Sequence, residues 1–322
     1  SLEFADGADT APSETESQQG AYRFLIHEQS MSVLKNPGPR ESRDEAHRIR
    51  PGSEFATFEP RQTSWYRFDF AEGDVASRWD SRVQAPVGRK LRATLYAEDG
   101  QKLLEAKVDN KGRLRFPDLA PPVGSWFLEL HANEPGFIHY VGTRKVGQRV
   151  AGQEAEPNNK RDQANRGDFL QPLTGRIGDD DKEDYFVFSV DQTTDDRLHT
   201  LRIESAEPGK LTLCLKSHDW KDVQCRDGVP PLQLTDLHLP TGDWGIHIRR
   251  AAAQSYSVTY QPQGPMEPGR EVEPNDLPRY ASGVPEKMRI KGRFDGDDTD
   301  IYQFMLDGEP QLWRFQVNGA GV

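Results

Sequence analysis

The stretch GDDDKEDYFVF, residues 178–188, joins an acidic loop to a strand of alternating apolar side chains. Upstream of it, residues 154–159 read Glu-Ala-Glu-Pro-Asn-Asn, and 117 residues later residues 271–276 read Glu-Val-Glu-Pro-Asn-Asp. A second acidic loop, residues 295–300, again opens into an apolar, partly aromatic stretch at residues 301–304. An ordered match of this length at nearly constant separation predicts an internal repeat.

A third, degenerate copy precedes these two. Residues 65–70 match residues 185–190 at an offset of 120, and residues 91–95 match residues 211–215 at the same offset. Turn signals separate short alternating runs, and no run has a convincing helical period. This pattern predicts an all-β chain of tandem antiparallel β-sandwich modules of jelly-roll-like form, the last one truncated. The first copy lacks both the Glu-x-Glu-Pro-Asn linker and the acidic loop.

The matches also predict where the modules begin and end. Residues 1–20 contain almost no large apolar groups, so we expect them to be disordered. A degenerate module follows at 21–150, a second module at 151–265 and the N-terminal half of a third at 266–322. Within the first module, the stretch from Ala21 to Leu34 is either an additional edge strand or the end of a preceding module. We expect the chain to be a piece of a larger parent protein.

Composition narrows the classes of function. Gly and Pro together make 51 of the 322 residues, and the formal net charge is −11. Nucleic acid is therefore not an expected partner, because phosphate binding needs a basic face. No apolar run is long enough for a membrane span. Two cysteines are too few for Cys-rich metal motifs or for a disulfide-dense miniature scaffold.

The two cysteines fall on the two strands of one expected hairpin. In the first copy, Asp99-Gly100 predicts a two-residue turn that places Thr94 opposite Glu105, and at the offset of 120 these positions become Cys214 and Cys225. We expect the two sulfurs to lie directly opposite each other on a solvent-leaning face, within disulfide reach if the pair is a non-hydrogen-bonded one. We predict this disulfide, and with it a secreted, periplasmic or cell-surface location. Two reduced thiols or, least favoured, a pair of metal ligands are the alternatives.

The repeated acidic residues are the constellation that suggests a chemistry. Alternate carboxylates project together from each linker, and the Asp-x-x-Asp loop returns to them if the first strand pairs back on its linker. Several anionic oxygens without nitrogen or sulfur suit Ca²⁺ rather than Zn²⁺, although neither loop is an EF-hand. The candidate ligands are Glu154, Glu156, Asn158, Asn159, Asp181, Asp184, Glu271, Glu273, Asn275, Asp276, Asp297 and Asp300. The alternative is a set of solvated turn residues that also discourage edge pairing, with Asp184 and Asp300 purely structural.

Taken together, these motifs resemble a known family. The linker, an Ala eight residues after its second Glu, a Gly-x-(Ile/Phe) strand and the Asp-x-x-Asp loop before an aromatic strand are similar to the bacterial pre-peptidase C-terminal (PPC) domain. That group includes the collagen-binding domains of clostridial collagenases. The resemblance covers residues 154–263, residues 271–322 as a truncated copy, and about 40–145 weakly. It implies jelly-roll-like accessory modules on secreted proteins, with Ca²⁺ held by the residues named above. Asn159 stands where the family has Asp, and no collagen-contacting motif carries over.

We therefore expect non-catalytic, Ca²⁺-stabilised accessory or adhesion-type modules of a secreted or cell-surface bacterial protein. No nucleophile elbow, Walker loop, dinucleotide fingerprint or zinc-protease His pair occurs. The alternative is a module that binds polysaccharide or fibrous protein and is attached to a secreted hydrolase or peptidase. An extracellular polymer or protein partner is compatible with both hypotheses, but the alternative needs an exposed aromatic platform. Exposure of Trp79, Trp126, Trp220 and Trp244 decides between the two hypotheses, because buried rings leave no such platform. Trp126 and Trp244 occupy equivalent positions, and we expect both in the cores.

Overall fold

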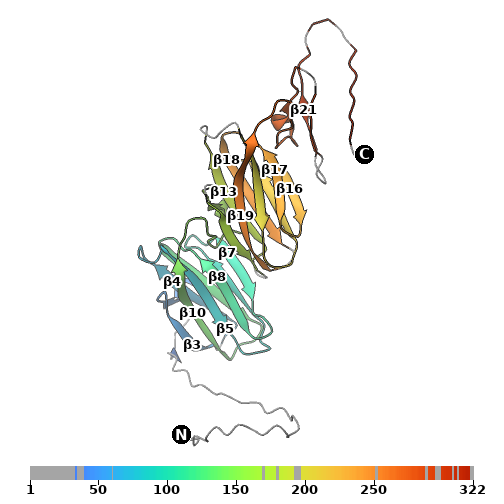
Figure 1. Ribbon diagram of the computed structural model, residues 1–322. Coiled ribbons are helices and arrows are strands. Elements are labelled where there is room, and N and C mark those ends of the chain that lie inside the picture. The colour runs from blue at the N-terminus through green and yellow to red at the C-terminus, as the bar shows by residue number, and fades with distance from the viewer. Residues whose placement is uncertain are drawn as a thin grey trace, which may run out of the picture.

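The computed structural model describes residues 33–34, 40–59, 61–168, 171–178, 181–191, 197–250, 253–286, 289–293, 299–306, 308–309 and 312–319. In these residues the secondary structure is almost entirely β, with three short 3₁₀ turns and no α-helix. The predicted all-β, antiparallel sandwich architecture is therefore confirmed (Figure 1). The segment 1–20, for which disorder is predicted, lies outside the described residues. No helix in the described ranges is long and apolar enough to cross a membrane.

The first sandwich packs two five-stranded sheets against each other, in the orders β1-β3-β10-β5-β8 and β2-β4-β9-β6-β7. The strands are β1 (Val33–Leu34), β2 (His47–Ile49), β3 (Glu54–Glu59), β4 (Thr63–Phe70), β5 (Ser77–Gln84), β6 (Leu91–Tyr96), β7 (Lys102–Lys107), β8 (Arg113–Leu119), β9 (Gly124–Ala132) and β10 (Phe137–Gln148). Two short edge strands, β1 and β2, pair in parallel, and the other neighbours are antiparallel. The end of the stretch 21–34 is thus an edge strand, while residues 21–32 lie outside the described residues.

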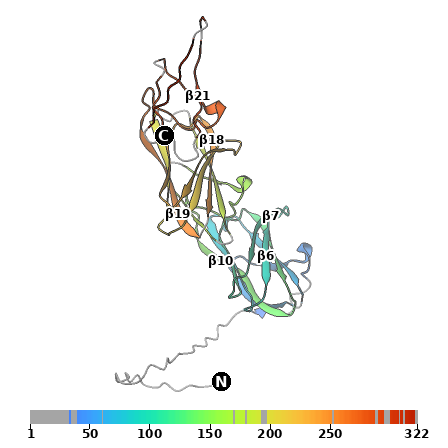
Figure 2. The same cartoon turned by 90° about the vertical axis from the view of Figure 1, so that its right-hand side faces the viewer.

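The second sandwich has the corresponding strand orders, β11-β13-β18-β15-β16 and β12-β19-β14-β17. Its strands are β11 (Asn165–Arg166), β12 (Leu173–Ile177), β13 (Glu183–Val190), β14 (Arg197–Glu204), β15 (Leu211–Lys216), β16 (Asp222–Gly228), β17 (Leu232–Leu237), β18 (Gly242–Arg250) and β19 (Gln254–Pro265). In place of β1, the single residue Gln153 forms a parallel bridge with Thr174. Figure 2 shows the two sandwiches end to end.

Alternation along the strands decides which side chains fill each core. On β13, Phe186 and Phe188 are each 1% exposed, and Val187 between them is only partly buried. They meet Ile246 and Trp244 of β18 and Val258 of β19 in one buried cluster. Each such aromatic side chain contributes about 2–3 kcal/mol through burial. The same arrangement fills the first sandwich, where Trp126 of β9 takes the place of Trp244.

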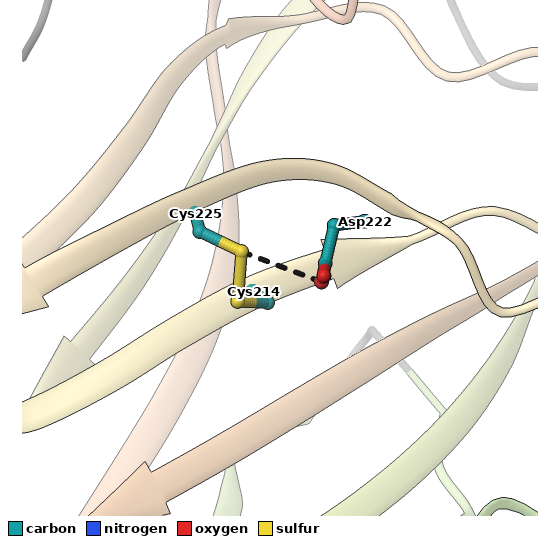
Figure 3. A group of neighbouring side chains, drawn as sticks. All are labelled: Cys214, Asp222 and Cys225. Carbon is teal, nitrogen blue, oxygen red and sulfur yellow. Dashed lines mark hydrogen bonds between the residues drawn. A yellow bond between two sulfur atoms is a disulfide. The ribbon is translucent and has the colours of Figure 1, made fainter. Parts of the chain in front are cut away.

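The predicted disulfide joins Cys214 on β15 to Cys225 on β16, which the strand register places directly opposite each other (Figure 3). Their Cα atoms are 4.1 Å apart. Cys225 is exposed, but Cys214 is buried, so the expectation that both lie on a solvent-leaning face is wrong for Cys214. The physical reason is the position of Cys214 in the sheet. It lies on β15, an inner strand between β16 and β18, and is also paired with His247 of β18. The carboxylate of Asp222 lies 3.4 Å from the Cys225 sulfur.

The turn of the equivalent hairpin differs from the predicted two-residue form. Thr94 does face Glu105, but a register shift follows at Tyr96. Ala97 N–H donates to Gln101 O, and Gly100 N–H donates to Ala97 O, which leaves a three-residue loop at 98–100. Gly100 takes the left-handed conformation, with φ of +90°, that such a bulged loop requires.

After residue 265 the chain carries little regular structure in its described part. β20 (Ser282–Gly283) and β21 (Tyr302–Gln303) form one short parallel pair. The strand expected at 301–304 is thus only two residues long. Its counterpart β13 extends over eight residues because β18 pairs along its whole length, and no described residue pairs with β21 in that way.

The first sandwich also buries an ionisable side chain, His139 on β10, which is 0% exposed. Its Nε2 shares a 2.7 Å hydrogen bond with the hydroxyl of Tyr66, and Thr57 lies opposite it on β3. Burial, and secondly the charge of Arg40, lower the pKa of His139 to about 3. His139 is therefore neutral in the folded protein at ordinary pH.

We expect His139→Gln to make the first sandwich less sensitive to acid. Because the folded pKa is below the ordinary value of about 6.5, the unfolded chain takes up the proton first, and stability is lost as the pH falls from about 6.5 towards 3. Between pH 7 and pH 4 this loss is about 3 kcal/mol. Urea unfolding of both proteins at the two pH values measures it. Equal losses in the variant and the parent would contradict the prediction.

Candidate functional site

The linker that follows β10 runs alongside β12 of the second sandwich. Glu154 N–H donates to Thr174 O at 2.8 Å, and Thr174 N–H donates to Gly152 O at 2.7 Å. Further along, Tyr185 N–H donates to Asn158 O at 3.0 Å, which attaches the linker to β13 as well. The linker is therefore held between strands of both sheets, and its alternate side chains point into the end of the sandwich.

Four carboxylates meet at this place. Glu154 and Glu156 come from the linker, Asp181 from the acidic loop and Asp184 from the start of β13, and their oxygens lie within 4.8 Å of one another. Glu154, Glu156 and Asp184 are 6%, 3% and 0% exposed. The predicted convergence of linker and loop is thus observed in the geometry, and we call these four residues the acidic cluster.

Two neighbours shape the cluster. Tyr256 on β19 donates its hydroxyl to Asp184 Oδ2 at 2.6 Å. Glu154 Oε2 accepts from the backbone N–H of Arg176 at 2.5 Å. A Cβ atom at Gly175 would stand 2.2 Å from Glu154 Oε2 and 2.3 Å from the Tyr256 hydroxyl, so only glycine leaves room for both groups. This explains why a glycine precedes Arg176.

The cluster is electrostatically unfavourable without a cation. Burial, and then the charge of Asp184, raise the pKa of Glu154 well above its usual range. Burial and the charge of Glu156 do the same for Asp184. Burial, with Asp184 and Glu156 as further causes, raises the pKa of Asp181 to about 10. Buried carboxylates are normally paired or coordinate a metal, and here they repel one another.

Three buried oxygens at the cluster have no hydrogen-bond partner: Glu156 Oε1, Asn158 Oδ1 and Asp184 Oδ1. Buried polar atoms almost always have a hydrogen-bond partner, an ordered water or an ion, so these three oxygens are open to one of these. All three are hard oxygen donors, and no nitrogen or sulfur ligand lies among them, which fits Ca²⁺. Asn159 lies beside them, and its amide, oriented to satisfy both ends, donates to Asp181 Oδ1 at 2.5 Å.

The second candidate site is built in the same way. Oxygens of Glu271, Glu273 and Asp300 lie within 4.8 Å of one another, and Glu271 Oε2 accepts from Arg293 N–H at 2.7 Å. The buried Asn275 has no hydrogen-bond partner for its Oδ1. A Cβ at the adjacent glycine, Gly292, would again meet Glu271 Oε2, at 2.5 Å.

Two further candidate ligands of this site differ in where they lie. Asp276 Oδ1 accepts from the backbone N–H of Thr299 at 3.1 Å, which ties the linker to the acidic loop. Asp297 lies outside the described residues. The hydroxyl that faces the site comes from Tyr302 on β21, which donates to Glu271 Oε1 at 2.6 Å, rather than from a strand equivalent to β19.

Each linker also contacts the sandwich that precedes it. Glu156 N–H donates to Asp118 O at 3.0 Å, and Glu156 O accepts from Ala120 N–H at 2.8 Å. At the next linker, Glu273 N–H donates to Asp236 O at 2.9 Å, and Glu273 O accepts from His238 N–H at 2.6 Å. Glu156 therefore joins the two sandwiches, because its backbone pairs with the first and its carboxylate lies in the acidic cluster of the second. Glu273 pairs in the same way with the second sandwich, and its carboxylate lies with Glu271 and Asp300.

Sequence reasoning did not find Tyr256, Asp118 or Asp236 as parts of these sites. Asp118 and Asp236 both adopt a left-handed backbone, with φ of 52° and 58°. The shared Asp-Leu pair at the ends of β8 and β17, 118 residues apart, is a weak signal that could have indicated them. Tyr256 is 72 residues from Asp184, and nothing local to it indicates the contact.

Three of the four tryptophans that could form a binding platform are buried. Trp79, Trp126 and Trp244 are each 4% exposed. Trp220 is half-buried and lies 5.6 Å from the ring of Tyr185, measured between centroids. These four side chains therefore form no exposed aromatic row.

A comparison with protein families finds no match for this chain, and a comparison with curated proteins finds none either. Among solved structures, tripeptidyl peptidase 2 is similar over 67% of this chain and 22% of its own length, with 10% identity and a TM-score of 0.22. Dimeric latent PorU from Porphyromonas gingivalis is similar over 74% of this chain and 23% of its own, with 13% identity and a TM-score of 0.20. The BSP domain of a biofilm-associated protein is similar over 63% of this chain and 48% of its own length, with 11% identity and a TM-score of 0.18. Likenesses this distant say nothing about activity, so any function has to be inferred from the chemistry of the two acidic sites.

Proposed function

We propose that the chain is a set of non-catalytic accessory sandwiches of a secreted or cell-surface bacterial protein, whose linkers are stiffened by Ca²⁺. The observation that carries the proposal is the set of three buried, unpartnered oxygens within the acidic cluster, on Glu156, Asn158 and Asp184. The disulfide between Cys214 and Cys225 supports an oxidising compartment. The resemblance to PPC domains is consistent with both.

In this proposal, Ca²⁺ neutralises the charges of the acidic cluster and thereby fixes the orientation of the sandwiches. With Ca²⁺ bound, Glu154 and Glu156 would be held to Asp181 and Asp184, which ties the linker to the second sandwich. The backbone of Glu156 is already paired with Asp118 and Ala120 of the first. Fixing one glutamate therefore restrains both neighbours, and Glu273 would do the same at the next linker.

The test is a comparison of the full chain in CaCl₂, MgCl₂ and EDTA. A ligand that binds only the folded state at 100 times its Kd stabilises by about 2.7 kcal/mol, so we expect a higher Tm in CaCl₂ than in EDTA. Mg²⁺ should have a smaller effect because it demands closer, more regular coordination. Trypsin cleavage in the linker at 149–161 should slow with Ca²⁺. Identical Tm and cleavage rates in all three buffers would refute the proposal.

A polysaccharide- or fibrous-protein-binding role is the less favoured alternative. It needs an exposed aromatic platform, and Trp79, Trp126 and Trp244 are buried. We therefore do not assign a polymer ligand to these sandwiches.

A further inference from the structure

The first sandwich has a buried arginine at the linker position that carries an asparagine in the two acidic sites. Trp65 N–H donates to Arg40 O at 2.8 Å, as Tyr185 N–H does to Asn158 O. Ile301 N–H donates to Asn275 O at 3.2 Å in the same way. The backbone thus places Arg40 where the linker enters the end of its sandwich.

The side chain of Arg40 points inward, is 1% exposed, and is paired. Its Nε and Nη2 donate to Glu59 Oε2 at 2.9 and 2.7 Å, and Nη2 also donates to Thr57 Oγ1 at 3.2 Å. Thr57 pairs with His139 of β10, as Gly175 pairs with Tyr256 of β19. The guanidinium therefore lies beside the strand positions that face the acidic cluster in the second sandwich.

The anionic groups of the acidic cluster are missing here. The residues before Arg40, Lys35 to Pro39, include no carboxylate, whereas Glu154 and Glu156 precede Asn158. On β4, Ser64 pairs with Leu130, at the register position where Asp184 of β13 pairs with Ile248. Among the described residues, the carboxylate of Glu59 is paired with this guanidinium, so the two charges balance without an ion.

We propose that the guanidinium of Arg40 is a built-in replacement for the ion, which makes the first sandwich independent of Ca²⁺ and confines the Ca²⁺ response to the two downstream linkers. Only the second part of this inference, the Ca²⁺ response of the two downstream linkers, rests on the proposed function. A covalently attached cation cannot be removed by chelation. The first sandwich then stays folded at any Ca²⁺ concentration, and only the linkers beyond it respond.

Hydrogen exchange of the full chain, followed by mass spectrometry, tests both halves separately. In the parent protein, Ca²⁺ should slow exchange at β13 and β18 at least tenfold relative to EDTA and leave β4 and β9 within twofold. Ca²⁺-dependent slowing at β4 and β9 as large as that at β13 would overturn the assignment of Arg40. No Ca²⁺ effect at β13 would instead refute the proposed function, and the Arg40 variants would still decide the role of the guanidinium charge.

Those variants are Arg40→Met, which removes the charge at similar length, and Arg40→Lys, which keeps it. Breaking a buried ion pair leaves Glu59 uncompensated, so Arg40→Met should speed exchange at β4 and β9 about 100-fold, equally in Ca²⁺ and in EDTA. In Arg40→Lys, exchange at β4 and β9 should be at least tenfold slower than in Arg40→Met. Arg48→Met is the matched control, because Arg48 is 73% exposed in its ion pair with Asp69, and it should change exchange less than threefold. Equal effects of Arg40→Met and Arg40→Lys, or an effect of Arg40→Met no larger than the control, would overturn the proposal.

Discussion

Asp184→Asn should stabilise the protein in EDTA and lose this advantage over the parent in CaCl₂. In EDTA the variant is expected to be about 2 kcal/mol more stable than the parent, because one of four buried, mutually repelling carboxylates becomes neutral. The Asn oxygen can still accept the hydrogen bond that Tyr256 donates to Asp184 Oδ2 at 2.6 Å. In CaCl₂ the variant lacks an anionic ligand, so the stabilisation of about 2.7 kcal/mol expected at 100 times the parent Kd should fall below about 1 kcal/mol.

The loss of the stabilising effect of Asp184→Asn when Ca²⁺ is added is what separates a metal site from a structural acidic patch. Urea unfolding in EDTA and in CaCl₂ gives the two free energies for each protein. Asp227→Asn is the matched control, since Asp227 is an exposed carboxylate on β16 of the same sandwich. It should change neither value by more than about 0.5 kcal/mol. If Asp184→Asn were destabilising in both buffers, Asp184 would be a structural hydrogen-bond acceptor rather than an ion ligand.

Gly175→Ala should destabilise the second sandwich by about 3 kcal/mol and weaken its Ca²⁺ response. The added Cβ would stand 2.2 Å from Glu154 Oε2 and 2.3 Å from the Tyr256 hydroxyl. Neither group moves easily, because Glu154 accepts from Arg176 N–H and Tyr256 donates to Asp184. The carboxylate of Glu154 would be displaced from the cluster together with its charge.

Gly178→Ala provides the control for this substitution. Gly178 lies three residues further along the chain, and a Cβ there meets nothing within 4 Å. Its stability should stay within about 0.5 kcal/mol of the parent. Thermal unfolding of both variants in CaCl₂ and EDTA compares them directly. Similar Tm values for the two variants would show that the glycine at 175 is not required by the carboxylate beside it.

Features that depend on local pattern could be predicted from the sequence. Alternation in residues 185–188 determines a strand with one buried face, because successive side chains point to opposite sides. The register of one hairpin was enough to pair Cys214 with Cys225. The predicted length of the loop between Ala97 and Gln101 was one residue too short. A bulge adds a residue to a turn without changing the strand pairs beyond it.

The acidic site shows the limit of such reasoning. Carboxylates on a linker and a nearby loop could be expected to converge, and Glu154, Glu156, Asp181 and Asp184 do lie together. Which of their oxygens are buried and unpartnered depends on how the end of the sandwich closes over them.

By itself, the sequence determined the all-β class, the Cys214–Cys225 pair and the residues that form the acidic cluster. Only the tertiary structure decided that Tyr256 reaches Asp184 and that Arg40 pairs with Glu59 in the first sandwich. Asp184 and Tyr256 lie on β13 and β19, in different sheets, and Arg40 lies between β1 and β2 whereas Glu59 ends β3. Such contacts depend on which sheets pack face to face, and a pattern of residues along a single strand contains no information about the strand opposite it.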